Sequence, residues 1–374
     1  MLLRRHCGSC RFVYNHFLNL RKTEYLNNEK TLNYYDCASL LTVLKKQDEY
    51  KWLNEINSQS LQQSLRHLDA AYGKFFNKQE KFPRFHKRTN GGSFTVPQSF
   101  KIEGNMVKLP KFKQPLKLKC HRKLEGKQLF CTVSMTPTGK FYLSVTCEVQ
   151  HRPHKKTKKK VGIDTGIKDL AILSTGKKYE NPKLLKRQLK RLKYEQKQLS
   201  KKQKGSSNRT RQRLVVARLH EKITNQRADY LHKVTTDIVK NHDLIAVESL
   251  VVKNLMKNHC LAQSFSDVAL GKFYTLLKYK SEWNNRTYIE IDRFFPSSKT
   301  CHRCGWINQE LTLKDREWTC SGCQVHHDRD DNASKMILKQ GINQCEAGTV
   351  SALKTKTTRG VLAGEVCEGG SLRF

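Results

Sequence analysis

The middle of the chain contains the segment Val161-Gly162-Ile163-Asp164-Thr165-Gly166. Its apolar residues predict a buried β-strand. Asp164 is unusual there, because aspartate is depleted in strands and a buried charge is costly unless it is paired or bound to a metal. The run Leu170–Leu173 leads into a Ser-Thr-Gly turn and predicts the second strand of a hairpin. Further strands are expected at 244–248 and 287–291, with helices between them, so the sequence predicts a mixed α/β sheet.

Acidic residues follow two other predicted elements. Glu248 ends the apolar run 244–247, and the cluster Asp328-Arg329-Asp330-Asp331 begins a helix expected to run from about 331 to 340. Each position has an ordinary explanation, since acids at strand ends are often caps or ion-pair partners and helix N-termini favour acids. Three carboxylates converging at one sheet edge can hold two Mg²⁺ or Mn²⁺ ions roughly 4 Å apart, which activate water for phosphodiester cleavage. Asp164, Glu248 and one acid of the cluster therefore predict a nuclease site.

Two Cys-x2-Cys segments are separated by fifteen residues. Each such knuckle puts two thiolates on one side of a tight turn, and two knuckles complete the tetrahedral four-thiolate set that Zn²⁺ prefers. A closed set leaves no open position, so a structural zinc site is expected at Cys301, Cys304, Cys320 and Cys323. Gly305 and Gly322 are expected to supply the φ freedom of the turns. Two disulfides are the alternative, which a reducing compartment disfavours, and His326 and His327 are superfluous as ligands.

The 374 residues carry a formal net charge of +38, which indicates a polyanionic partner, with nucleic acid as the first candidate. A long helical stretch at roughly 182–241, interrupted near 205–208, has a strongly basic first half. The alternative is that this half is simply a solvated helix face. We expect its basic residues to contact phosphates, in particular Lys183, Lys186, Arg187, Lys190, Arg191 and Lys193. No apolar run approaches the ~18 residues of a membrane span, and the start has no signal-peptide core, so a cytoplasmic protein is expected.

The rest of the chain falls into segments of different composition. Residues 1–80 read as helical, with Cys7 and Cys10 as incidental thiols at a helix start. Residues 93–150 alternate with period two, which predicts a β-hairpin within a small antiparallel sheet or barrel. The basic segment 151–160 is expected to be a linker at a domain boundary, and the Gly/Ser/Thr-rich tail 341–374 is expected to be flexible.

These motifs together resemble TnpB, the OrfB-type protein of bacterial insertion sequences, a family related to the miniature type V CRISPR nucleases. The order and spacing of the motifs fit over essentially the whole chain. The matching segments are 161–168, 246–250, 297–305 and 327–333, with 10–15, 82–85 and 279–280 as further matches.

The resemblance implies an RNase H-like RuvC domain at 153–340 with a zinc ribbon inserted at about 297–327. A nucleic-acid-binding lobe at 1–152 would hold the β-barrel with a helical insertion. Asp164 and Glu248 would be the first two catalytic acids, and the family pattern Asp-x-Asn-Ala selects Asp330 as the third, with Asp328 as the fallback. The implied activity is RNA-guided, Mg²⁺- or Mn²⁺-dependent cleavage of DNA in the nucleoid. The partners would be a noncoding guide RNA of the element and a target DNA whose adjacent motif the N-terminal region reads.

Two departures from the family pattern accompany the match. The segment that begins at Arg11 is preceded by less chain than is usual in the family, which predicts a missing first strand and an open edge in the barrel. Trp283-Asn284-Asn285-Arg286 stands where the family tends to have glycine, for which only a local loop effect is expected. The alternatives are a non-cleaving nucleic-acid-binding regulator and a strand-transferring transposase. The oligomeric state is left open.

Overall fold

The computed structural model describes residues 2–88, 91–120, 123–312, 314–347 and 372–373. The chain divides into two compact units, of which the first spans Met1–Gln150 and includes the strand at 372–373, and the second begins at His151. In the part of the chain that the structure describes, no helix is long and apolar enough to cross a membrane.

Helices pack on a small sheet in the first unit. The long helix α1 and the helix α3 bury an apolar stripe that includes Phe17, Leu61, Leu65 and Leu68. These helices confirm the helical character expected for residues 1–80. Cys7 and Cys10, expected as incidental thiols at a helix start, are buried in the first turns of α1. The helices of this unit are α1 (Leu2–Asn28), α2 (Tyr34–Leu44), the 3-10 helix η1 (Asp48–Glu55) and α3 (Ser58–Phe76).

The strands of the first unit form two separate antiparallel sheets. The order in the larger sheet is β1-β5-β6-β14, and β5 pairs with β6 as the predicted hairpin, with Cys131 opposite Val145. The smaller sheet has the order β2-β3-β4. Neither sheet closes on itself among the described residues, so a barrel stays a prediction. The bounds are β1 (Gly92–Val96), β2 (Lys101–Glu103), β3 (Met106–Lys108), β4 (Leu116–Lys117), β5 (Lys127–Met135), β6 (Phe141–Glu148) and β14 (Leu372–Arg373).

The second unit is built on a five-stranded sheet of order β11-β10-β7-β8-β9. The strands β7, β8 and β9 are antiparallel neighbours, whereas β10 and β11 run parallel to β7. The strands expected from the sequence are thus confirmed, and they form the predicted mixed sheet. The bounds are β7 (Lys160–Asp164), β8 (Asp169–Leu173), β9 (Lys178–Glu180), β10 (Leu244–Glu248) and β11 (Thr287–Ile291).

Helices cover both faces of this sheet. On one face, α5 (Ser207–Asn241) and α8 (Leu270–Trp283) pack against Ile163 and Val247. On the other, α9 (Arg329–Glu346) packs against Ala246. A Cβ at Gly162 would lie 2.1 Å from the Ser334 carbonyl oxygen, and a Cβ at Gly341 would lie 2.6 Å from the Cβ of Ala246. Glycine at both positions therefore lets α9 approach the sheet closely.

The last helix is longer than the sequence indicated. We expected it to end near Gln340 and the tail to begin at Gly341, but α9 continues to Glu346 and Gly341 is buried within it. Close packing on the sheet explains why this glycine does not end the helix. The expected flexibility of the tail beyond residue 347 falls mostly outside the described residues.

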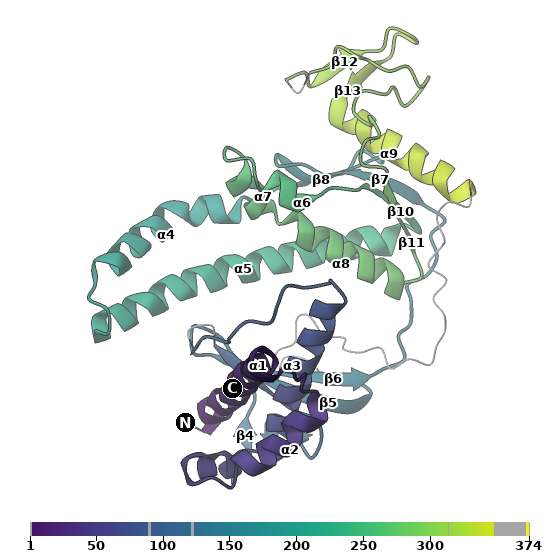
Figure 1. The fold of residues 1–374 in the computed structure, drawn as a ribbon. Helices are drawn as coiled ribbons and strands as arrows, with labels where there is room; N and C mark the ends of the chain where they lie inside the picture. Colours follow the sequence, from purple (N-terminus) through teal and green to yellow (C-terminus); the bar gives the residue numbers. More distant parts are fainter. Residues whose placement is uncertain (1, 89–90, 121–122, 313, 348–371, 374) are drawn as a thin grey trace. The chain divides into compact units, whose positions relative to one another are not determined.

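The remaining elements of the second unit project from the sheet and its helices. Figure 1 shows α4 (Leu184–Lys201) beside α5 as a long helical hairpin, which confirms the predicted break near residues 205–208. The short helices α6 (Val252–Leu255) and α7 (Ala262–Val268) follow β10. The small hairpin of β12 (Glu317–Thr319) and β13 (His326–Asp328) adjoins the start of α9.

Candidate active site and metal centre

Asp164 and Glu248 lie at the carboxyl ends of two neighbouring parallel strands. In the pairing of β7 with β10, Ile163 is opposite Val247, and the register continued by one residue puts Asp164 beside Glu248. Ligand sites in open α/β sheets form outside the carboxyl ends of the strands. Two acids 84 positions apart in the sequence (164 and 248) are thus brought to one sheet edge.

Both carboxylates are on the α9 side of the sheet. Side chains alternate between the two faces of a strand, so Asp164 shares a face with Gly162, and Glu248 shares one with Ala246. Those two residues are the ones that α9 covers. The first turn of α9 carries Asp330, so the third predicted acid comes to the same face.

Asp328 and Asp330 have different surroundings. Asp328 is the N-cap of α9, and its Oδ1 accepts hydrogen bonds from the backbone N–H groups of Asp330 (3.0 Å) and Asp331 (2.9 Å). Its Oδ2 lies 3.5 Å from the Lys178 ammonium. Asp330 is instead a charged neighbour of Asp164. The N-cap role accounts for an acidic residue at position 328 without a metal, whereas the charge of Asp330 acts on Asp164.

The electrostatics of the site centre on Asp164. Burial raises the pKa of Asp164 well above its usual range, and the negative charges of Glu248 and Asp330 raise this pKa further. The backbone N–H of Thr165 and the positive charge of Arg329 oppose the shift. A nearby cation would stabilise the ionised form of such a carboxylate, as a bound metal ion does.

Protein groups contact the other two acids. The Ser297 hydroxyl donates a hydrogen bond to Oε1 of Glu248. The carboxylate of Asp330 lies 3.3 Å from Nη2 of Arg329 and 3.6 Å from Nη1 of Arg316. The oxygens of the three acids are not gathered as tightly as the cysteine sulfurs described below, which form the compact group of potential metal ligands among the described residues.

A partly buried tyrosine lies next to the acids. The Tyr274 hydroxyl on α8 is 2.6 Å from the hydroxyl of Thr165, the residue after Asp164. Burial raises the pKa of Tyr274, and the charges of Glu248 and Asp164 act in the same direction. Tyr274 therefore remains a neutral phenol that holds the Thr165 side chain where the chain leaves β7.

The four predicted zinc ligands are clustered. Their sulfurs all lie within 4.8 Å of one another, with 3.7 Å between Cys301 and Cys323 and 3.5 Å between Cys304 and Cys320. Tetrahedral Zn²⁺ with Zn–S bonds of about 2.3 Å requires S–S separations of roughly 3.8 Å, whereas a disulfide is about 2.05 Å long. The cysteines are free thiols, so the geometry fits four-thiolate zinc and not the disulfide alternative.

The two knuckles have the same backbone design. The N–H of Gly305 bonds to the Cys301 carbonyl at 2.9 Å, and the N–H of Gln324 bonds to the Cys320 carbonyl at 2.8 Å. Gly305 and Gln324 are the left-handed residues, with φ of 83° and 57°. The expectation that Gly322 supplies this freedom was wrong. Gly322 instead leaves room for Trp306, whose Cβ would be 3.1 Å from a Cβ at that position.

Asn332 ties the ribbon to α9. This asparagine is 1% exposed, and its Nδ2 donates to the Thr300 carbonyl at 2.8 Å. Its Oδ1 lies 2.9 Å from the backbone nitrogen and 3.0 Å from the Nδ1 of His302, inside the first knuckle. Because Asn332 is two residues beyond Asp330, these hydrogen bonds fix the position of the third acid relative to the first knuckle. His327, predicted to be superfluous as a ligand, packs its Nε2 3.1 Å from the Cys301 sulfur.

Family models match three parts of the chain. A model described as "Probable transposase" matches residues 144–259, one described as "Cas12f1-like, TNB domain" matches 271–337, and one described as "Helix-turn-helix domain" matches 1–30. The second match contains the ribbon and the start of α9. The third falls on residues that form the single helix α1 here.

Similar proteins cover nearly the whole chain. A "Putative RNA-guided DNA endonuclease" of Streptomyces pristinaespiralis is 39% identical over 350 residues, which are 92% of this chain and 87% of the relative. The "Putative RNA-guided DNA endonuclease InsQ" of Escherichia coli (strain K12) is 34% identical over 91% of this chain and 88% of its own. A mimivirus protein named "TnpB-like protein L79" is 25% identical over 55% of this chain and 42% of its own.

This chain belongs to the TnpB family. The 39% identity over most of both chains establishes the membership that the motifs indicated. A solved Cas12f1–sgRNA–target DNA complex also aligns with 90% of this chain and 94% of its own, at 15% identity and a TM-score of 0.36. That superposition is too loose to add to the assignment.

The basic arm of this TnpB-family chain is an exposed helix. The six predicted phosphate contacts lie at the N-cap and in the first half of α4, all six side chains are exposed, and none forms an ion pair among the described residues. The apolar side of α4 packs on α5 through Leu192. Asp267, which is buried, accepts the backbone N–H groups of Leu185 (2.9 Å) and Lys186 (3.0 Å) and lies 3.4 Å from Arg227. The start of the arm is thus fixed to α7 and α5.

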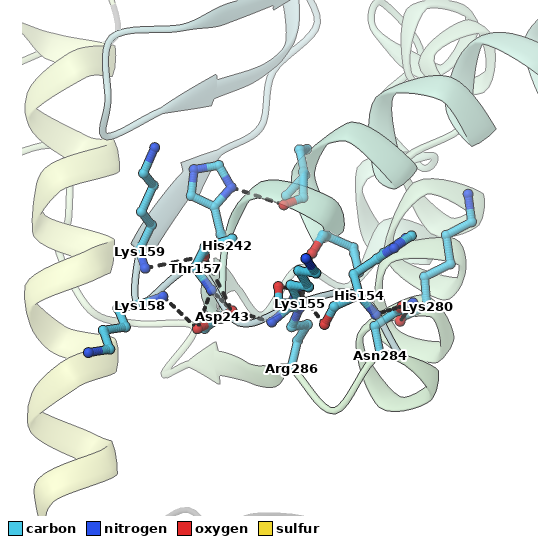
Figure 2. Close-up of polar contacts among 12 residues, drawn as sticks. His154, Lys155, Thr157, Lys158, Lys159, His242, Asp243, Lys280, Asn284 and Arg286 are labelled. Carbon is cyan, nitrogen blue, oxygen red and sulfur yellow. Dashed lines mark hydrogen bonds and ion pairs between the residues drawn. The ribbon is translucent and has the colours of Figure 1, made fainter. Parts of the chain in front are cut away.

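The segment at residues 283–286, where the sequence departs from the family pattern, contains a left-handed residue and a buried ion pair. Asn285 occupies the left-handed region with φ of 52°, which is where glycine is favoured. The Arg286 side chain is fully buried and pairs with Asp243, and both hold the segment before β7 (Figure 2). The left-handed Asn285 is a local loop feature, so the expectation of a local loop effect stays a prediction.

Proposed function

We propose that this chain is an RNA-guided, metal-dependent DNA endonuclease of an insertion sequence. The observation that carries the proposal is the convergence of Asp164, Glu248 and Asp330 on the α9 side of one sheet edge. The relatives named as RNA-guided DNA endonucleases support the reaction and the partners, a guide RNA and a target DNA.

The sheet supports an RNase H-like RuvC fold for the second unit. Three antiparallel strands followed by two parallel ones, in the order β9-β8-β7-β10-β11, place the first strand at the centre with an acid at its end. In such a domain the first and fourth strands carry catalytic acids, which here are Asp164 and Glu248. We place the nuclease domain at 153–340 and the nucleic-acid-binding lobe, including its proposed barrel, at 1–152.

The carboxylates fit Mg²⁺ or Mn²⁺, because hard cations prefer oxygen ligands. Asp164, Glu248 and Asp330 would hold the ions, which supply charge stabilisation of the attacking and leaving oxygens and an activated water. Ser297 orients Glu248 by donating to its Oε1. Tyr274 fixes the chain at Thr165, and Arg329 and Arg316 counter the charge of Asp330.

Zinc would be bound by Cys301, Cys304, Cys320 and Cys323, and its role would be structural. A four-thiolate set has no open position for substrate. The hydrogen bonds of Asn332 to Thr300 and His302 would then hold the first turn of α9 in a fixed position against the rigid ribbon. The exposed lysines and arginines of α4 would contact phosphates, and DNA cleavage would place the protein at the nucleoid in the cytoplasm.

The test is reconstitution with the RNA that flanks the element. Wild-type protein, purified with this RNA, is expected to cut a matched DNA duplex in Mg²⁺, whereas the Asp164→Ala variant binds the same RNA but does not cut. Cleavage without RNA, or cleavage by Asp164→Ala at the wild-type rate, would contradict the proposal. Tight RNA binding with no cutting by the wild type would favour a non-cleaving regulator, and joined DNA products would favour a strand-transferring transposase.

A further inference from the structure

The basic segment that leads into β7 is hydrogen-bonded to other parts of the second unit. We refer to residues 154–160 as the strap. Asp243 accepts hydrogen bonds from the backbone N–H groups of Thr157 (2.9 Å) and Lys158 (2.7 Å) and from the Thr157 hydroxyl (3.2 Å). Figure 2 shows this carboxylate beside Thr157, with the side chains of Lys158 and Lys159 extending away from it.

Two residues of the loop after α8 complete the anchor. Arg286 pairs with Asp243 and donates to the carbonyl oxygens of His154 (3.3 Å) and Lys155 (2.7 Å) (Figure 2). Asn284 accepts the backbone N–H of His154 at 3.1 Å. The strap is therefore held at both its beginning and its middle by side chains from elements far away in the sequence.

The anchor uses none of the lysine side chains. Each of these hydrogen bonds involves the strap backbone or the Thr157 hydroxyl. The five lysines are exposed, and among the described residues none of them forms an ion pair: Lys155, Lys156, Lys158, Lys159 and Lys160. The nearby acid Asp243 is already occupied by Arg286 and by backbone N–H groups, so it does not neutralise them.

This arrangement is costly unless an anion compensates for it. Five like charges within seven residues repel one another, and such a block is ordinarily disordered. Fixing the segment in advance, however, removes the ordering cost that a mobile chain would have to meet on binding a polyanion. The combination of a built anchor and unused cations is what a preorganised phosphate-binding surface requires.

We propose that the strap is such a surface and binds the phosphodiester backbone of a nucleic acid along its lysine side. This inference rests on the proposed function only for the source of the ligand. RNA and DNA share the phosphate chemistry, so the two sources are separate arms of the test: the flanking RNA alone, and the RNA-loaded protein with a target duplex.

The test compares two sets of four substitutions with the same change in charge. The strap variant carries K155Q, K156Q, K158Q and K159Q. The control variant changes four exposed lysines on α5, α8 and α9 by K222Q, K272Q, K278Q and K339Q. Each phosphate contact contributes roughly 0.7–0.9 to the slope of log affinity against log salt. With all four lysines on phosphates, the strap variant is therefore expected to lose about 3–4 from the wild-type slope in at least one arm, and the control variant less than about 1.

A third variant, T157V together with N284A, loosens the anchor but keeps every lysine. It is expected to bind more weakly than the wild type with an unchanged salt slope, because only the placement of the charges is lost. Equal slopes for the strap and control variants in both arms, or no salt-dependent binding by the wild type, would overturn the inference. Wild-type affinity for the third variant would overturn the preorganisation.

Cleavage measured on the same preparations separates this inference from the proposed function. A wild type that cuts, with strap and control variants of equal slope, refutes the strap and leaves the nuclease. A wild type that does not cut, with the expected loss of slope in the strap variant, refutes the nuclease and leaves the strap. Thermal unfolding of all the variants shows that their folds are intact.

Discussion

Replacing Asn332 with alanine tests the link between the zinc ribbon and the third acid. The change removes three hydrogen bonds at 2.8–3.0 Å, to Thr300 and His302, from a side chain that is 1% exposed. A typical net contribution is about 0.5–1.5 kcal/mol per bond, so the expected loss of unfolding free energy is about 2–4 kcal/mol. For a unit of this size, about 3 kcal/mol corresponds to a fall in Tm of roughly 6–12 °C.

The effect on chemistry should exceed the effect on folding. The lost bonds fix the first turn of α9 against the first knuckle, and Asp330 lies in that turn. A displacement of about 1 Å in a catalytic group can cost roughly 100-fold in rate. Single-turnover cleavage by Asn332→Ala, measured well below its Tm and with saturating RNA, is therefore expected to fall about 10- to 100-fold and to need more Mg²⁺ for half-maximal rate.

Thr235→Val is a matched control for this variant. It also removes buried side-chain hydrogen bonds in the second unit, to the Leu231 carbonyl and from Lys280, but on α5 and away from the ribbon. We expect it to lower the Tm while leaving the rate and the Mg²⁺ dependence near those of the wild type. If Asn332→Ala is folded and cuts with wild-type rate and Mg²⁺ dependence, the ribbon does not set the position of Asp330.

Three further changes give distinct readouts. The pKa of Asp164 is raised in the folded state, so its stabilising contribution is present below about pH 4 and is lost as the pH rises through the folded pKa. The Asp164→Asn variant should therefore have a higher Tm than the wild type at pH 7.5 in the presence of a chelator, but not at low pH. An equal difference in Tm at both pH values would contradict this. Cys320→Ser should reduce bound zinc below one equivalent and increase amide exchange in β12 and β13, and an unchanged zinc content measured by metal analysis would rule out the four-thiolate site. Asp267→Ala should cost about 1–2 kcal/mol and weaken amide protection at Leu185 and Lys186, whereas unchanged protection would show that it does not cap α4.

The strands and the acids could be predicted because their signals are local. An apolar run with one carboxylate at its end is visible in five or six residues, as at Asp164 and Glu248. Their adjacency depends on the parallel register of β7 with β10, which no local pattern specifies. The choice between Asp328 and Asp330 likewise depended on the family pattern, since only the structure shows that Asp328 is occupied as an N-cap.

Contacts that depend on tertiary packing were missed. Gly341 resembled a helix end, but it lies inside α9 because the sheet is too close for a side chain there. Asn332, Tyr274 and the Asp243–Arg286 pair join segments at least 30 positions apart, and polar residues of these types are common on surfaces. The extent of the N-terminal sheets could not be predicted from the sequence either, because strands of two or three residues have too few positions to show a period.

The most direct test of the central claim is guided cleavage by two single variants of neighbouring acids. With the flanking RNA, a matched duplex and Mg²⁺, Asp328→Ala should retain most of the wild-type cleavage. Its Tm should be lower, because the variant loses a helix cap and a 3.5 Å ion pair with Lys178. Asp330→Ala should bind the RNA and the duplex but not cut. Cleavage by Asp330→Ala at the wild-type rate, or cleavage by the wild type without the RNA, would contradict the account of a guided nuclease built on Asp164, Glu248 and Asp330.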